Sequence, residues 1–270
     1  MTRMPRSLQK GLAFRQKLRT GQIVSGAWST LGSPEIAYGM ARAGLDYVLV
    51  DLEHGKGGID GLSAQVQALA GLDTAIMVRL PEHGAGDIKR ILDAGANALL
   101  APQVNAAAEA AGIIEASLFP PEGRRGVAVG SIAAADWGYE PESYFANANE
   151  ALTILTQVET PQAVETLPEV LALSRLDGIF VGPNDLSAAM GMFRDYDNPA
   201  FRDAFAQVME RTLAAGKVFG ALPFPGMEPA RLFAGGAQVV TGGADMALVR
   251  AGAQAIVAQA EECRRTKGKG

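Results

Sequence analysis

The sequence predicts a closed (β/α)₈ barrel, formed by a single domain that spans residues 1–270. Three observations support this fold class. Short apolar runs alternate with longer, Ala-rich helical segments along almost the whole chain. Eight such runs occur, and they lack the period-two polar alternation of strands that face solvent on one side. A length of 270 residues is also ordinary for a one-domain barrel of this type.

An extra helix is expected before the first strand. Ser7 can cap it, and Gly21 supplies a stop just after Arg19. The eight predicted strands are residues 23–28, 47–50, 75–78, 98–100, 153–158, 178–181, 218–221 and 239–241. The helices expected between them include residues 34–43, 85–93, 106–117, 161–173 and 199–215. Parallel strands require such crossover helices, so the order of elements favours a parallel sheet.

A doubly wound open sheet is the alternative fold. Its phosphate fingerprint, Gly-x-Gly-x-x-Gly after the first strand, is absent, which favours the barrel. One predicted connection, residues 119–150, is unusually long and contains Arg124, Arg125 and Trp137. Long connections are often functional. Arg124 and Arg125 could reach a distal substrate carboxylate or a neighbouring subunit, or they could simply be solvated.

Composition narrows the class of partners. The formal net charge of −5 provides no extended basic field, so we expect no nucleic-acid partner. The basic amino terminus lacks the apolar run of a signal peptide, and no later stretch approaches the length of a transmembrane helix. We therefore expect a cytoplasmic protein with no membrane partner. The only cysteine, Cys263, cannot form an intramolecular disulfide.

Two carboxylates follow adjacent predicted strands. Glu159 and Asp185 stand at the carboxyl ends of the fifth and sixth strands, where barrels of this type place their catalytic groups. Either residue alone could be a helix cap or a first-turn carboxylate. As a pair beside Gln157, they predict a site for a divalent cation with oxygen ligands, magnesium or manganese rather than zinc. The backbone of Gly182, Pro183 and Asn184 could approach an anionic ligand closely.

An imidazole and a guanidinium are expected at the same end of the barrel. His54 follows Asp51 by three residues, so the carboxylate could orient the ring for general-base catalysis. His83 is interpreted as a loop residue that lines the mouth of the site. Arg79 ends the buried third strand and therefore needs either a structural carboxylate or an anionic substrate. No predicted strand contains a lysine, which argues against Schiff-base chemistry.

Several of these segments together resemble the metal-dependent class II pyruvate aldolase family, which includes 4-hydroxy-2-oxoheptanedioate aldolase and 2-dehydro-3-deoxyglucarate aldolase. The resemblance extends from about Gly26 to Val257. It is carried by Asp51-Leu52-Glu53-His54, Val78-Arg79, residues 88–96, residues 119–126, Gln157-Val158-Glu159-Thr160 and Gly182-Pro183-Asn184-Asp185-Leu186-Ser187. It implies a phosphoenolpyruvate/pyruvate-binding type of barrel that cleaves 4-hydroxy-2-oxo acids reversibly to pyruvate and an aldehyde.

The resemblance also implies roles for individual residues. Glu159 and Asp185 would bind Mg²⁺, Mn²⁺ or Co²⁺, with Gln157 beside the ion. Arg79 would contact the pyruvyl oxygen, and His54, paired with Asp51, would move the proton. The remaining implied contacts are the backbone of Gly182 to Asn184 with the pyruvate carboxylate, Leu222 with the aldehyde half, and Asp93 in a supporting role. Family members are typically homohexamers built from trimers.

Three departures from the family pattern concern the acceptor pocket. Leu52 replaces a common glycine, and the segments 80–83 and 223–226 differ from those usual in the family. The sequence is also compatible with two alternative functions. The same metal–enolate site could serve an oxaloacetate decarboxylase or acyl-CoA lyase reaction, or the barrel could bind 2-oxo acids without catalysis.

Overall fold

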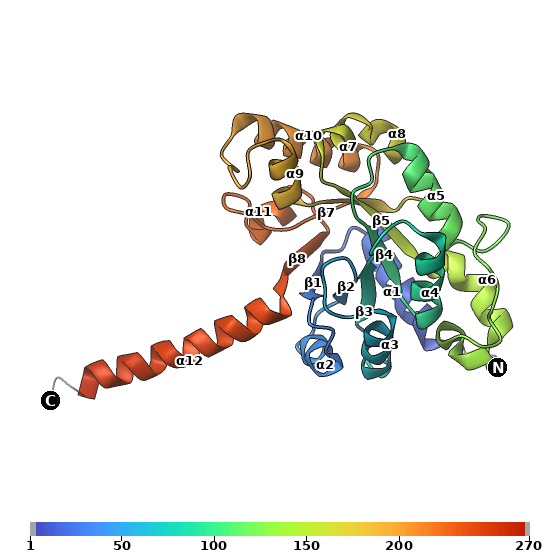
Figure 1. The fold of residues 1–270 in the computed structure, drawn as a ribbon, viewed down its shortest axis with the longest axis horizontal. Coiled ribbons are helices and arrows are strands. Elements are labelled where there is room, and N and C mark those ends of the chain that lie inside the picture. Colours follow the sequence, from blue (N-terminus) through green and yellow to red (C-terminus); the bar gives the residue numbers. More distant parts are fainter. Residues whose placement is uncertain (1–3, 268–270) are drawn as a thin grey trace.

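The computed structural model describes residues 4–267 and contains a closed barrel of eight parallel strands in sequence order (Figure 1). This confirms the predicted fold class. The strands are β1 (Val24–Ser29), β2 (Tyr47–Asp51), β3 (Ala75–Arg79), β4 (Ala98–Ala101), β5 (Thr153–Val158), β6 (Gly178–Val181), β7 (Val218–Ala221) and β8 (Val239–Ala244). Each predicted strand is present within three residues of its expected ends.

Helices surround the barrel and connect its strands. They are α1 (Arg6–Arg19), α2 (Pro34–Arg42), α3 (Ile59–Ala68), α4 (Ala85–Ala94), α5 (Ala107–Ser117), the 3₁₀ helix η1 (Ala133–Gly138), α6 (Pro141–Ala151), α7 (Pro161–Glu165), α8 (Leu167–Leu171), α9 (Pro183–Ala189), α10 (Pro199–Ala214), α11 (Pro229–Ala234) and α12 (Asp245–Lys267). Within the described part of the chain, no helix combines the length and apolar character needed to span a membrane.

The strands are buried on both faces, which explains their continuous apolar runs. On β2, Val48 and Val50 pack outward against the helices, whereas Tyr47 and Leu49 belong to the cluster inside the barrel. Successive side chains on a strand point to opposite faces, so both sets must be apolar when both faces are covered. This alternation also determines which strand-end residues face the interior of the barrel.

Gly26 is required by the packing inside the barrel. A Cβ atom at this position would lie 2.2 Å from Cζ of Tyr47. The Tyr47 ring crosses the interior, and its hydroxyl lies 2.8 Å from Oγ1 of Thr241 on β8. A large side chain on β2 is therefore accommodated by a glycine on the neighbouring strand.

The extra amino-terminal helix α1 is present and closes the amino-terminal end of the barrel. Its residues Phe14 and Leu18 belong to the interior cluster. The expected cap was wrong, because the residue before the helix is Pro5 and the Ser7 hydroxyl instead donates to the Ala134 carbonyl at 2.5 Å. Ser7 meets a partner far away in the sequence, and local capping rules do not include such partners.

The helix expected over residues 161–173 is divided into α7 and α8. Thr166 ends α7, and Pro168 lies in the first turn of α8. A proline cannot continue the hydrogen-bond ladder of a helix, which explains the interruption.

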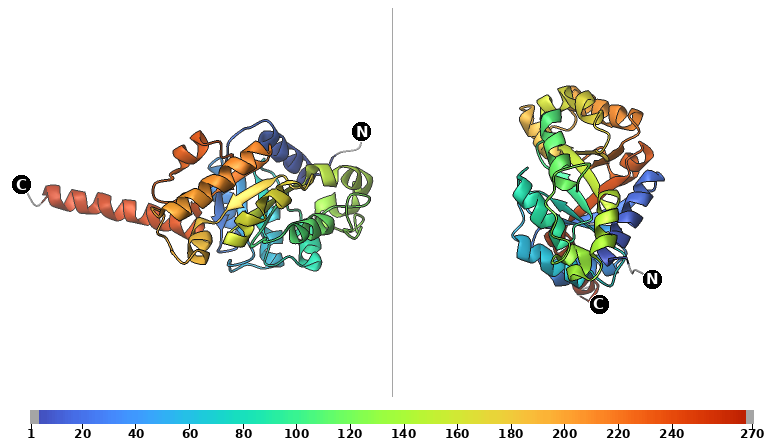
Figure 2. Two further views of the ribbon diagram at one scale, coloured as in Figure 1. Left: turned by 90° about the horizontal axis from the view of Figure 1, so that it is seen from above. Right: turned by 90° about the vertical axis from the view of Figure 1, so that its right-hand side faces the viewer.

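The last helix, α12, projects away from the barrel (Figure 1), and a view from above shows the same extension (Figure 2). Only Asp245, its first residue, is buried. The Asp245 carboxylate accepts hydrogen bonds from the backbone of Thr30 and Leu31, which anchors the start of the helix to the end of β1. The other residues of α12 are exposed except Ala247 and Ala260, which are partly buried.

Candidate active site

Strand alternation places the predicted polar residues inside the carboxyl end of the barrel. On β2, Asp51 continues the interior series that includes Leu49, and on β3, Arg79 continues the series that includes Met77. Asp51 and Arg79 are also paired in the register of the two strands. Each side chain is buried, so the pair stands on top of the interior core rather than in solvent.

Strand alternation also places residues of β5 and β6 inside the carboxyl end of the barrel. Gln157 and Glu159 follow Leu155 with a spacing of two residues, which keeps all three on the interior side of β5. Gly182 follows Phe180 on β6 with the same spacing. A Cβ atom on Gly182 would lie 2.6 Å from Oε1 of Glu159, so the glycine makes room for this carboxylate.

Glu159 is a buried carboxylate with few donors. Its Oε1 accepts a hydrogen bond from Nε2 of Gln157 at 2.6 Å, and its Oε2 accepts one from the backbone N–H of Gln103 at 2.9 Å. The pKa of Glu159 is raised to about 7, chiefly by burial, and the charges of Asp185 and Glu53 contribute to this rise. The site therefore carries more negative charge than its own donors neutralise.

The orientation of Gln157 leaves one oxygen without a partner. Its amide nitrogen donates to Glu159, while its Oε1 is buried and has no hydrogen-bond partner among the described residues. Buried polar atoms are normally satisfied, so an unpaired oxygen beside a buried carboxylate indicates a missing donor or cation.

Asp185 lies in the first turn of α9, three residues after Gly182. Its side chain is exposed at the mouth of the barrel. Asn184, also exposed, accepts a hydrogen bond through Oδ1 from the Tyr196 hydroxyl. Because β5 and β6 are paired, Glu159 and Asp185 come from neighbouring strand ends, as the sequence predicts.

The residues present fit a divalent cation. Gly182 makes room for the Glu159 carboxylate, the Gln157 oxygen beside it has no partner, and the charge of Asp185 acts on Glu159 and helps to raise its pKa. No group of three or more His, Cys, Asp or Glu side chains suited to a metal occurs in residues 4–267. A pair of carboxylates completed by water and substrate oxygens is characteristic of Mg²⁺ rather than of a closed zinc site.

Arg79 has structural carboxylate partners, the first of the two possibilities that the sequence left open for it. Its Nε and Nη2 atoms donate to the two oxygens of Asp51 at 2.9 and 2.7 Å, and Nη1 lies 2.9 Å from Oε2 of Glu53. Its guanidinium also stacks 4.4 Å above the ring of Trp28. These contacts use three of the five N–H groups, so two remain for a ligand.

His54 lies on the exposed loop after β2, and 73% of its side chain is accessible. The expected contact between its ring and Asp51 is not formed. Asp51 instead accepts the backbone N–H groups of Glu53 and His54, while its two oxygens bind Arg79. The carboxylate next to the ring is Glu53, at 3.8 Å from Nε2.

Two further predicted residues lie near the mouth of the barrel. Leu222 follows β7 and packs partly buried against the interior cluster. His83 is half-buried, and its Nε2 lies 2.6 Å from the carbonyl oxygen of Pro102, which follows β4. His83 therefore links the loops after β3 and β4.

Asp93 and Arg125 meet at the opposite end of the barrel. Asp93 is near the carboxyl end of α4, and it forms an ion pair of 2.7 Å with the buried Arg125. The Arg125 guanidinium also stacks 4.4 Å over Phe119, whereas the neighbouring Arg124 is exposed and pairs with Glu115. Neither arginine reaches the strand ends that carry Glu159.

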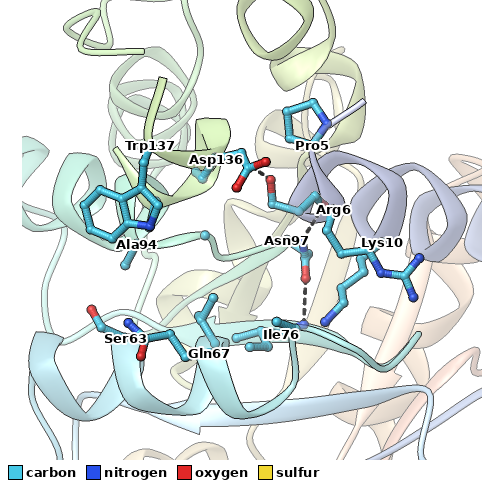
Figure 3. A pocket seen from close by; sticks show the side chains of 16 residues that line it. Pro5, Arg6, Lys10, Ser63, Gln67, Ile76, Ala94, Asn97, Asp136 and Trp137 are labelled. Carbon is cyan, nitrogen blue, oxygen red and sulfur yellow. Dashed lines mark hydrogen bonds between the residues drawn. The ribbon is translucent and has the colours of Figure 1, made fainter. Parts of the chain in front are cut away.

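The long connection that contains these arginines covers the amino-terminal end of the barrel. Its residues pack against α1, and Trp137 lies at one side of a cavity of about 220 Å³ that Arg6 and Lys10 border on the other side (Figure 3). The cavity contains none of the predicted catalytic residues. The length of this connection is therefore explained by packing at the amino-terminal end.

Three residues of the site were not assigned from the sequence. Glu53 could have been found, because it follows Asp51 by two residues at a strand end. Trp28 has the interior position of β1 nearest the carboxyl end, but an aromatic residue in a strand usually indicates only core packing. Gln103 acts through its backbone in a conformation with φ of 47°, and no side-chain pattern predicts that contact.

Known proteins resemble this chain over nearly its full length. It is 37% identical over 235 residues to 2-keto-3-deoxy-L-rhamnonate aldolase from Klebsiella pneumoniae, covering 87% of this chain and 88% of the relative. It is 35% identical over 247 residues to 4-hydroxy-2-oxo-heptane-1,7-dioate aldolase from the same species, covering 92% and 93% of the two chains. These relatives are named as aldolases, which supports the aldolase interpretation rather than its alternatives.

A solved structure gives the same result for the fold. A HpcH/HpaI aldolase/citrate lyase family protein from Burkholderia cenocepacia superimposes with a TM-score of 0.85 at 31% identity, covering 93% of this chain and 99% of the other. The sequence profile of the HpcH/HpaI aldolase/citrate lyase family matches residues 24–251. The match includes all eight strands and the strand-end residues described above. The protein belongs to the HpcH/HpaI aldolase/citrate lyase family.

Proposed function

We propose that this enzyme cleaves 4-hydroxy-2-oxo acids reversibly to pyruvate and an aldehyde, with Mg²⁺, Mn²⁺ or Co²⁺ held by Glu159 and Asp185. The observation that carries the proposal is the buried Glu159 carboxylate, whose pKa is raised to about 7 beside an unpaired Gln157 oxygen. The names of the related aldolases support the same reaction class.

The cation, when bound, supplies Lewis-acid charge for the 2-oxo acid and its developing enolate. The two free N–H groups of Arg79 donate to the 2-oxo oxygen and stabilise the negative charge that forms there. Asp51 and Glu53 hold the guanidinium in place through their ion pairs. Trp28 supports its other face. Arg79 is therefore preorganised before substrate binds.

His54 is proposed to accept the proton of the 4-hydroxyl group as the carbon–carbon bond breaks. Its exposure at the mouth of the barrel places the ring where a substrate enters. Its Nε2 lies 3.8 Å from Oε1 of Glu53, the nearest carboxylate. Asp51 acts on His54 indirectly, because it fixes the backbone of this loop.

Three further contacts are proposed for the other parts of the substrate and for the fold around it. The backbone of Gly182, Pro183 and Asn184 is proposed to bind the pyruvate carboxylate, which Gly182 allows to approach closely. Leu222 is proposed to contact the aldehyde half. Asp93 is proposed to support the fold through its ion pair with Arg125 rather than to touch substrate.

Self-association is also part of the proposal. The long helix α12 exposes five large apolar side chains, Met246, Leu248, Val249, Ile256 and Val257. A helix with this much exposed apolar surface gains stability only by packing. We propose that a second copy of the chain covers it, within a homotrimer or homohexamer. The proposed cytoplasmic location and the single domain over residues 1–270 rest on the sequence alone.

The test is replacement of Glu159 by Gln, which keeps the shape of the side chain and removes its charge. We expect loss of metal-dependent pyruvate release by more than about a hundredfold. Glu169→Gln, on the exposed surface of α8, is the matched control and should keep full activity. Chelator treatment of the wild type should abolish turnover, and added Mg²⁺ or Mn²⁺ should restore it. Full activity of Glu159→Gln would refute the proposed site.

A further inference from the structure

A second polar cavity of about 490 Å³ lies at the amino-terminal end of the barrel, beside the start of β5, β6 and β7. Four cationic side chains line it, Arg15, Arg19, Arg175 and Lys217, together with the single carboxylate of Asp177. We call it the basic cavity. Its lining comes from α1 and from the residues before β6 and β7, so it is separated from Glu159 by the length of the strands.

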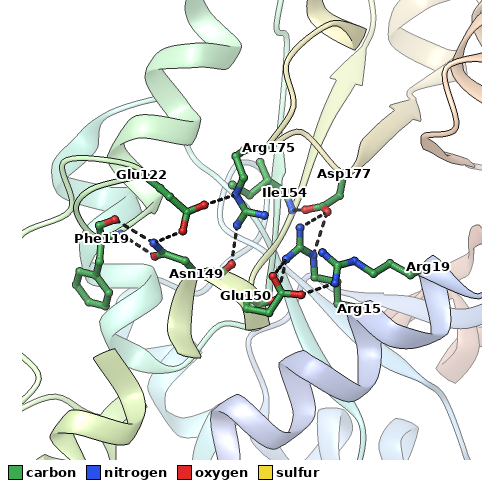
Figure 4. A network of polar contacts seen from close by, with 9 residues as sticks. All are labelled: Arg15, Arg19, Phe119, Glu122, Asn149, Glu150, Ile154, Arg175 and Asp177. Carbon is green, nitrogen blue, oxygen red and sulfur yellow. Dashed lines mark hydrogen bonds and ion pairs between the residues drawn. The ribbon is translucent and has the colours of Figure 1, made fainter. Parts of the chain in front are cut away.

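Each arginine of the basic cavity already has a carboxylate partner. Arg15 donates from Nε and Nη2 to Oδ1 of Asp177 at 3.0 and 2.7 Å, and Oδ2 of Asp177 accepts the backbone N–H of Ile154 (Figure 4). The other two pairs are Arg19 with Glu150 and Arg175 with Glu122. The carboxylates at this end of the barrel are thus occupied by guanidinium groups.

Lys217 is the one cationic side chain of the basic cavity that forms no ion pair with a described carboxylate. Its Nζ donates to the carbonyl oxygens of Leu173 and Leu176 at 3.0 and 2.6 Å. An ammonium group has three N–H donors, so one remains. Burial is the main cause that lowers the pKa of Lys217; the charge of Asp177 opposes this shift, and the charges of Arg15 and Arg175 add to it. An anion in the cavity would relieve this excess of positive charge.

Thr153 provides an independent indication of a ligand. Its side chain is fully buried at the start of β5, it lines the basic cavity, and its hydroxyl has no hydrogen-bond partner among the described residues. A hydroxyl can rotate to donate to any acceptor that enters. Leaving it unpaired costs free energy, which an acceptor in the cavity would recover.

We propose that the basic cavity binds a small oxyanion, a phosphate or carboxylate group, through the free N–H of Lys217 and the hydroxyl of Thr153. Arg15, Arg19 and Arg175 contribute positive potential without giving up their own partners. The mouth of the cavity is open to solvent, because about half of the Arg19 and Glu150 side chains is accessible. This site is distinct from the proposed pyruvate site in place and in composition.

The experiment measures the melting temperature of the full chain in Mg²⁺ buffer, with sodium phosphate or sodium succinate compared with sodium chloride at equal ionic strength. A ligand that binds the folded state raises the melting temperature. The variants are Lys217→Met and Thr153→Val, and Lys89→Met on the exposed face of α4 is the matched control. Broadening of the ³¹P signal of phosphate gives a second measure of binding for any variant that is destabilised.

We expect wild type and Lys89→Met to bind alike, and Lys217→Met and Thr153→Val to bind about tenfold more weakly or not at all. Stabilisation by phosphate alone would identify a phosphate site, and stabilisation by both anions a general oxyanion site. Stabilisation by succinate alone, lost in Lys217→Met, would identify a carboxylate site. No binding in the wild type, or equal binding in Lys217→Met, would overturn the proposal.

Discussion

Burial of the Glu159 carboxylate costs desolvation free energy, and the same burial prepares the carboxylate to bind a cation. The carboxylate is removed from water and receives two hydrogen bonds, but it also feels the charges of Asp185 and Glu53. Burial therefore raises its pKa from 4.5 to about 7. Between these two values the folded protein holds a proton that the unfolded chain has released, so rising pH destabilises the metal-free protein across this window.

This coupling predicts a pH-dependent response to metal. A metal ligand must be deprotonated, so protons compete with the cation below about pH 7, and apparent affinity should fall about tenfold for each further pH unit. The increase in melting temperature caused by Mg²⁺ should therefore be larger at about pH 8 than at about pH 6. Glu159→Gln should lose both the increase and its pH dependence. An equal increase at both pH values in the wild type would contradict the assignment.

For individual residues, the sequence predicted correctly which polar side chains lie at the carboxyl end of the barrel, but it did not predict all of their contacts. Asp51, Arg79, Gln157 and Glu159 all lie inside the carboxyl end of the barrel, because strand alternation fixes their side. The expected pairing of Asp51 with the His54 ring was wrong. A guanidinium from the next strand offers Asp51 two parallel hydrogen bonds, and an exposed imidazole cannot match them.

The long connection between α5 and β5 shows that the length of a connection does not by itself reveal whether the connection has a function. Its length favoured a functional role, but simple solvation of its arginines was left equally open. In the structure it packs Phe119, Tyr144 and the buried Arg125 against the amino-terminal end of the barrel. Its polar residues serve this packing, as the pair of Arg125 with Asp93 shows.

Replacement of Arg125 by Met should therefore lower stability and leave catalysis intact. The change removes a buried cation and leaves Asp93 with 20% of its side chain exposed, so we expect a loss of about 2–4 kcal/mol in the free energy of unfolding. Arg124→Met is the matched control, because its pair with Glu115 is exposed and should contribute less than about 1 kcal/mol. Urea denaturation measures both. A large loss of kcat/KM in folded Arg125→Met would instead place this residue in the active site.

At the scale of the whole molecule, packing on the barrel does not explain the position of α12. Every other long helix packs on the barrel, whereas α12 extends from it over 23 residues (Figure 1). Its buried first residue anchors it, and its exposed apolar side chains lack a partner within the described chain. A stable fold with such a surface fits association between copies.

Replacement of Ile256 by Asp should weaken this association. Ile256 is 70% exposed on α12, so a charge there costs little in an isolated chain but much inside a subunit interface. We expect light scattering after size-exclusion chromatography to show a smaller assembly with an unchanged circular dichroism spectrum. Gln259→Asp on the same helix is the control for helix propensity. If Ile256→Asp keeps the full native mass, α12 is not at the interface.

The barrel, the order of its strands and the set of polar residues at their carboxyl ends could all be predicted from the amino-acid sequence. These properties follow from apolar patterns within short segments, which indicate the type of each element and the side chains that it must bury. The tertiary structure was needed to show that Asp51 binds Arg79, that Asp93 binds Arg125 far from the site, and that Lys217 is the one cation of the basic cavity without an ion pair to a described carboxylate. Such choices depend on which side chains from distant segments meet, and on the cost of leaving any one of them buried and unpaired.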